Sequence, residues 1–138
     1  MDNANFINLL NSDLGTEFRS IVQYVQHIAT IKGPEFQSTV EELRAHLRQE
    51  VEHATLLAEQ IDFLGGIPSV SVPDVPSASD SQGALELDLE LEEGQLGRYR
   101  ERVEQATEMG LTDVAEVLRP LLQQTQDHVR DLRGALGR

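Results

Sequence analysis

The chain has 138 residues, enough for a compact domain to bury a core of its own, and we expect residues 1–138 to form one domain. It contains no cysteine, which excludes disulfides, thiolate metal ligands and cysteine nucleophiles. Asp and Glu outnumber Lys and Arg by 24 to 11, for a formal net charge of −13, which argues against nucleic acid as a partner and attracts cations. An acidic excess also serves solubility on its own.

The expected location follows from two features of the chain. No stretch approaches the roughly 18 to 20 apolar residues of a membrane helix. No basic leader precedes the apolar residues of "MDNANFINLL" at the N-terminus. We therefore expect a soluble, cytoplasmic protein with no membrane contact.

Four segments show the spacing of apolar side chains that is typical of amphipathic helices. In chain order they run from about Asn5 to Ile31, from about Pro34 to Leu64, from about Ser81 to Gly110 and from Thr112 to about Leu136. Gly110 is expected to cap the third segment at its C-terminus, and Thr112 the fourth at its N-terminus. No internal repeat is obvious in the residue letters.

One passage within the third segment allows a second interpretation. The letters "ALELDLELE", residues 84–92, alternate strictly and fit a half-buried strand. Leu, Glu and Ala favour helix, and the passage holds no β-branched or aromatic residue. Because the helical spacing also continues to Ala106, we expect a helix.

The segment between the second and third helices, residues 65–82, has several prolines and serines and no helical period. A loop this long is uncommon in a compact domain unless it must span a distance. Helices of about 25 to 30 residues are roughly 40 Å long, and a crossover along one of them accounts for the loop. The sequence therefore predicts an all-α four-helix bundle of two antiparallel pairs, with a long crossover between helices 2 and 3.

Each expected helix has an apolar stripe that is interrupted near its middle. The interruptions are, in chain order, Glu17, Glu50, Glu92, and the pair Thr125 and His128. His53 lies about 60° from Glu50 around the helix, on the same side. Desolvating one carboxylate costs several kcal/mol, and three at a similar depth would also repel one another. Cations among them would explain all the interruptions together.

Glutamate and imidazole ligands without thiolate suit iron, manganese or zinc. Inward glutamates combined with Glu-x-x-His motifs are the ligand pattern of dinuclear carboxylate sites in four-helix bundles. We therefore predict a metal centre and no catalytic group beyond its ligands. The predicted ligands are Glu17, Glu50, His53, Glu92 and His128.

Other readings of these and neighbouring residues stay open. A small shift of register would exchange Glu92 for its neighbour Glu93. His46 is either a further ligand or, more simply, a half-buried structural histidine. Tyr24 and Tyr99 each follow an inward glutamate by two turns. They are either core tyrosines, hydrogen-bond donors to the ligands, or redox-active rings. His27 is expected at the surface or in an interface.

The residues resemble the ferritin-like superfamily, and bacterioferritin within it, over roughly residues 6 to 136. The segments "INLLNSDLGTEFRSIVQYVQH" and "EVEHATLLAEQIDFLGGIPS" are similar to that family's first two helices. The segments "DLELE" and "LLQQTQDH" are similar to parts of its third and fourth helices. The resemblance implies a di-iron carboxylate site on the five predicted ligands, a reaction with O₂ or peroxide, and a homodimer or larger homo-oligomer.

The chain departs from that family at three places. Thr125 stands three residues before His128, where the family has a glutamate that bridges the metals. Val51 stands where bacterioferritins have the methionine that binds haem, so we expect no haem. The short fifth helix that helps to build the family's cage is missing, so iron storage inside a cage is not expected.

The first departure changes the charge of the site. Two divalent cations carry +4, whereas Glu17, Glu50 and Glu92 supply −3. We expect the second metal to bind more weakly or to need an outside anion. Gln124 is the nearest candidate for a substitute ligand, although its amide oxygen adds no charge.

Three functions agree with these observations. The first is a di-iron, or manganese–iron, oxidoreductase of the ferroxidase type, whose open coordination positions take O₂ or peroxide. The second is a binding protein that sequesters or transfers one tightly held metal without turnover. The third is a degenerate bundle that serves only as an interaction module.

Overall fold

The computed structural model describes residues 1–138 and consists of four long helices and no strand. The helices are α1 (Asn3–Thr30), α2 (Gln37–Phe63), α3 (Ser81–Glu108) and α4 (Thr112–Ala135), and a short 3-10 helix, η1 (Pro34–Phe36), precedes α2. The prediction of an all-α four-helix bundle is confirmed, and each predicted boundary agrees with the structure to within one helical turn.

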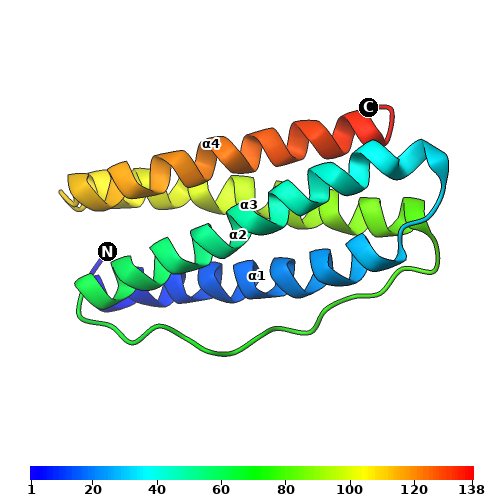
Figure 1. The fold of residues 1–138 in the computed structure, drawn as a ribbon. Coiled ribbons are helices and arrows are strands. Elements are labelled where there is room, and N and C mark those ends of the chain that lie inside the picture. Colours follow the sequence, from blue (N-terminus) through cyan, green and yellow to red (C-terminus); the bar gives the residue numbers. More distant parts are fainter.

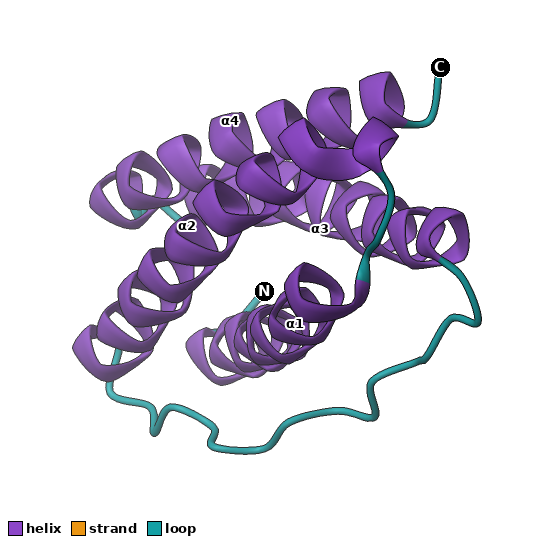
Figure 2. Ribbon diagram, turned by 45° about the vertical axis from the view of Figure 1, so that its right-hand side comes forward, coloured by secondary structure: helices purple, strands orange, loops and turns teal.

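The bundle is built from two pairs of helices, α1 with α2 and α3 with α4 (Figure 1). Each pair is joined by a short connection, whereas the loop between α2 and α3 runs the length of α1 on the outside of the bundle (Figure 2). Asn11 holds this crossover, because its amide donates to the Ile67 carbonyl at 3.1 Å and accepts from the Ser69 amide at 2.8 Å. The predicted crossover is confirmed.

The helix ends depend on a few capping residues. Asp2 and Asp80 cap α1 and α3, because their carboxylates accept from the backbone N–H three residues on. Gly110 ends α3 with φ +76°, and the next amide, Leu111 N–H, donates to the Ala106 carbonyl at 2.8 Å. The predicted N-cap at Thr112 was wrong, because Leu111 occupies that position and makes no side-chain capping bond.

The passage at residues 84–92 is helical and lies wholly within α3. Its burial does not alternate as in a strand, since the adjacent Ala84 and Leu85 are both buried whereas Leu87 is only half-buried. The helical interpretation of this passage is therefore confirmed.

Two apolar clusters fill the two ends of the bundle. One contains Phe6, Leu10, Leu57, Ile61 and Leu118, and the other contains Tyr24, Leu43, Leu85 and Leu132. The five predicted metal ligands lie between these clusters along every helix, so they form a polar layer at the middle of the bundle. None of the four helices combines the length and the apolar character that crossing a bilayer requires.

Candidate metal centre

The five predicted ligands converge from all four helices, and none of their side chains is more than 1% exposed. His53 Nδ1 lies 3.4 Å from Glu50 Oε2 and 3.8 Å from Glu17 Oε2. His128 Nδ1 lies 3.0 Å from Glu50 Oε1 and 3.4 Å from Glu92 Oε2. The interruptions of the four apolar stripes therefore meet at one point, as expected.

These side chains form two overlapping groups. The Glu17 group consists of Glu17, Glu50 and His53, and the Glu92 group consists of Glu50, Glu92 and His128. Within each group, one ligand atom from every residue lies within 4.8 Å of the others. Glu50 belongs to both groups, with Oε2 toward His53 and Oε1 toward His128. Its carboxylate is therefore placed to bridge two cations.

The two neighbouring glutamates of α3 have different surroundings. Glu92 is 1% exposed and lies in the polar layer, where the Tyr24 hydroxyl donates to its Oε1 at 2.8 Å. Glu93 is at the surface and pairs with Arg133 at 3.3 Å. The register with Glu92 inward is the one that the helix adopts.

Each of the two predicted histidine ligands, His53 and His128, is oriented by a glutamine on another helix. His53 Nε2 lies 2.7 Å from Gln124 Oε1, and His128 Nε2 lies 2.5 Å from Gln49 Oε1. An amide oxygen only accepts, so Nε2 carries a proton in both rings and Nδ1 is left as the atom that can bind a metal. The expectation of Gln124 as a substitute ligand was wrong, because its oxygen is used by His53.

The outer glutamates are held by donors from the opposite side of the bundle. Glu17 Oε1 accepts from the Tyr99 hydroxyl at 2.6 Å and from Gln95 Nε2 at 2.7 Å. Glu92 Oε1 accepts from Tyr24, as described above. Both tyrosines are therefore core residues whose hydroxyls orient a carboxylate, which combines two of the roles expected for them.

The charges of the three carboxylates are linked. Burial raises the pKa of Glu50 well above its usual range, and the neighbouring Glu17 and Glu92 raise it further. Burial also opposes ionisation of Glu92, but the nearby His128 ring and Glu50 carboxyl outweigh it and lower its pKa to about 2. For Glu17, burial likewise opposes ionisation, but the nearby Glu50 carboxyl and His53 ring outweigh it and lower the pKa. In the metal-free protein a proton is therefore held more readily by the central carboxyl than by either outer one.

Two buried atoms of the Glu17 group have no hydrogen-bond partner, namely Glu17 Oε2 and His53 Nδ1. They lie 3.8 Å apart, which is too far for a hydrogen bond between them. Buried polar atoms without partners are rare and destabilising, and often mark a position that an ion or a water occupies. A divalent cation between these two atoms would satisfy both, so the residues present fit a metal.

The fourth helix lacks a carboxylate in this layer. Thr125 is buried, but its hydroxyl donates to the Leu121 carbonyl of its own helix at 2.7 Å. Asp127, the nearest acidic residue of α4, is exposed. The layer therefore offers three carboxylates and two imidazoles.

Two other histidines differ from expectation. The half-buried position expected for His46 was wrong, because it is 3% exposed, stacks on His128 with ring centroids 4.0 Å apart and has Nε2 3.0 Å from Asp131. The surface or interface position expected for His27 was also wrong. That ring is 2% exposed, and its Nδ1 lies 2.7 Å from Asp88 Oδ1. Neither histidine belongs to the two ligand groups.

The polar layer repeats itself in the two halves of the chain, although no repeat is obvious in the residue letters. Helices α1 and α3 both carry an Asp, a Glu, a Tyr and a basic residue, in that order and at equal spacing. In α1 these are Asp13, Glu17, Tyr24 and His27, and in α3 they are Asp88, Glu92, Tyr99 and Arg102. Helices α2 and α4 share the positions Gln49, Glu50 and His53 with Gln124, Thr125 and His128. The tyrosine of each half donates to the outer glutamate of the other half. The equal spacing in the two halves could have indicated this pairing.

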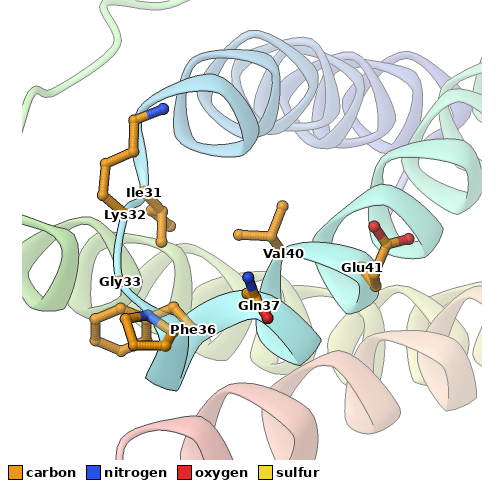
Figure 3. Close-up of a pocket in the computed structure, with 8 residues that line it drawn as sticks. Ile31, Lys32, Gly33, Phe36, Gln37, Val40 and Glu41 are labelled. Carbon is orange, nitrogen blue, oxygen red and sulfur yellow. The ribbon is translucent and has the colours of Figure 1, made fainter.

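A large surface hollow lies away from this layer. It has a volume of about 670 Å³ and lies where the chain passes from α1 into α2 (Figure 3). Its lining includes Ile31, Lys32, Gln37, Val40 and Glu41, and none of the five predicted ligands. The hollow therefore does not serve the candidate metal centre.

Comparisons with known proteins agree with this geometry. The model of the family described as Ferritin-like domain matches residues 7–138. Among solved structures, the chain is similar to a ferritin-like, diiron-carboxylate protein from Bacillus anthracis str. Ames, with a TM-score of 0.93, 30% identity and 99% of each chain covered. It is also similar in fold to the bacterioferritin-related protein from Bacteroides fragilis, described as a dodecameric thioferritin, with a TM-score of 0.89, 24% identity, and 99% of this chain and 87% of that chain covered. No curated protein matches the chain.

Proposed function

The chain belongs to the ferritin-like domain family, and on that premise we propose that its polar layer holds two iron ions and oxidises Fe²⁺, or a small molecule, with O₂ or peroxide. The observation that carries the proposal is the position of Glu50, whose two oxygens face two different groups of ligand atoms. The similar protein from Bacillus anthracis, named as a diiron-carboxylate protein, supports iron. Manganese and zinc suit the same ligands.

The residues of the polar layer would bind different ions. Glu17 and His53 would hold one ion, Glu92 and His128 the other, and Glu50 both. The ions would supply open coordination positions for the oxidant and accept or release electrons. The protein excludes water, because all five side chains are buried, and it fixes the ligands before the metal arrives.

A second function is favoured by one observation, the bond of the Thr125 hydroxyl to its own helix. Without a carboxylate from α4, two divalent ions are left with an uncompensated positive charge. If only one ion is held tightly, the protein sequesters or transfers metal without turnover. The two functions share a site and differ in the number of ions and in O₂ consumption.

Anaerobic titration with Fe²⁺, followed by addition of O₂, tests the proposal. We expect two equivalents of Fe²⁺ to bind, and O₂ to be consumed as the near-ultraviolet absorbance of Fe³⁺ rises. One equivalent bound without O₂ uptake would favour sequestration, and no binding would leave only an interaction module. Glu92→Gln should abolish the second equivalent, whereas Glu93→Gln, the same change at the exposed neighbour, should behave as the wild type.

We also propose that the protein forms a homo-oligomer. The related protein from Bacteroides fragilis is described as dodecameric. On α1 and α2 the apolar side chains of Val22, Val25, Val51 and Phe63 are 45% to 68% exposed in the single chain. Light scattering coupled to size exclusion tests this, and a monomer at micromolar concentration would contradict it.

A further inference from the structure

The two ligand groups are related by the internal repeat, but they are not equally prepared for a metal ion. In the Glu92 group, His128 Nδ1 is within 3.0 Å of Glu50 Oε1, so these two ligand atoms are bonded to each other. In the Glu17 group, Glu17 Oε2 and His53 Nδ1 have no partner. A cation that enters the Glu92 group must break the bond between His128 and Glu50. A cation that enters between Glu17 Oε2 and His53 Nδ1 breaks no such bond.

The two groups also differ at the position of the repeat that follows each outer glutamate by three residues. Gln95 follows Glu92 by three residues, and its counterpart Ser20 follows Glu17 by three. Gln95 Nε2 donates to Glu17 Oε1 at 2.7 Å, across the bundle. The Ser20 hydroxyl instead donates to the Glu17 carbonyl of its own helix and does not bond to Glu92. Glu17 therefore has two donors on one oxygen, and Glu92 has one.

Arg98 fixes the orientation of the Gln95 amide. Its Nε donates to Gln95 Oε1 at 2.6 Å, so the oxygen of the amide faces the guanidinium and the NH₂ faces Glu17. Arg98 is 35% exposed and lies 3.9 Å from Asp13, so it reaches from the surface to the buried layer. With Oε1 of Glu17 occupied by Gln95 and Tyr99, only Oε2 remains for a metal.

We infer that Gln95, locked by Arg98, is a positioning residue that makes the Glu17 group the tighter of the two metal positions. The inference rests on the proposed metal centre. Partners that orient a ligand from outside typically change metal affinity by about 10- to 100-fold. The Glu17 group should therefore fill first, and the loss of Gln95 should weaken that step alone.

Calorimetric titration of the metal-free protein with Co²⁺ tests this without reference to activity. The wild type should show two steps. Gln95→Leu should weaken the first by about 10- to 100-fold and leave the second unchanged. Tyr24→Phe, which removes the donor to Glu92, should do the reverse. Arg98→Met should weaken the first step to a smaller extent, and the control Ser20→Ala should change neither.

Several results separate the inference from the proposed function. A wild type that binds no Co²⁺ overturns both. A wild type that binds Co²⁺ in one unresolved step, or a Gln95→Leu variant that binds as the wild type does, overturns the inference alone. The inference also fails if Gln95→Leu and Tyr24→Phe weaken the same step. Circular dichroism melting of the metal-free variants verifies that each is folded.

Discussion

Arg102 on α3 donates to both carboxylate oxygens of the fully buried Asp13 on α1, at 2.8 and 3.2 Å. The repeat relates this pair to Asp88 on α3 and His27 on α1, which lie 2.7 Å apart. In each pair, the acid lies one turn before an outer glutamate of the metal layer. These two polar pairs therefore join α1 to α3 beside the glutamates and hold the two halves of the bundle in register.

Removing the cation of the first pair should destabilise the metal-free protein. Arg102→Leu removes both hydrogen bonds to the buried Asp13 carboxylate and leaves only Arg98, 3.9 Å away, and loss of one partner of a buried pair typically costs about 3–5 kcal/mol. Urea unfolding should show this loss at pH 7. The control Arg100→Leu, two residues earlier and exposed, should stay within about 0.5 kcal/mol of the wild type. Equal stability of the two variants would show that the pair contributes nothing.

The pH dependence of stability should report the same carboxylate. Burial raises the pKa of Asp13 from 3.8 to about 6, although Arg102 opposes the rise. The folded protein thus retains a proton that the unfolded chain releases near pH 4, and this contribution to stability is lost as the pH rises from about 4 to about 6.

Asp13→Asn cannot titrate, so it isolates this effect. Relative to the variant, the wild type should lose unfolding free energy between pH 4 and 6 and show no further change up to pH 8. Urea unfolding at each pH measures the difference. A difference that stays constant, or that grows in favour of the wild type over that interval, contradicts the assignment.

The glutamines that bond to the histidines should matter for metal binding. Gln124→Leu removes the acceptor at 2.7 Å from His53 Nε2, so the ring is free to turn or to change tautomer. We expect the affinity for Co²⁺ to fall by about 10- to 100-fold. Gln123→Leu is the matched control, because that neighbouring side chain is exposed. If both variants bind as the wild type does, Gln124 does not orient His53.

A carboxylate at position 125 should strengthen the second metal step. Thr125→Glu places a fourth negative charge in the layer, and an interaction of about 1.4 kcal/mol would raise the affinity about tenfold. Gln126→Glu adds the same charge at an exposed position and should change little. The comparison uses equilibrium dialysis against Mn²⁺. Equal loading of the wild type and Thr125→Glu would show that charge does not limit the second site.

The fold and the five candidate ligands could be predicted from the sequence because both depend on local spacing. Apolar residues three and four apart define one face of a helix, and Glu17 or Glu50 on that face must be buried wherever the helix packs. Glycines at the helix ends then set the lengths. This information lies within each helix and needs no knowledge of its neighbours.

The contacts between helices could not be predicted in the same way. His27 was expected at the surface or in an interface, but it is buried beside Asp88, which is 61 residues away in the chain. Gln95 and Arg98 appeared only as ordinary polar residues of a helix. Their roles depend on which side chain meets them across the bundle, and spacing alone does not determine that.

The most direct test of the metal centre is a crystal of the protein soaked in Mn²⁺ and measured for anomalous scattering. We expect two peaks on either side of the Glu50 carboxylate, one bound by Glu17 and His53 and the other by Glu92 and His128. Glutamates that meet only water or arginine, with no peak among them, would contradict the account.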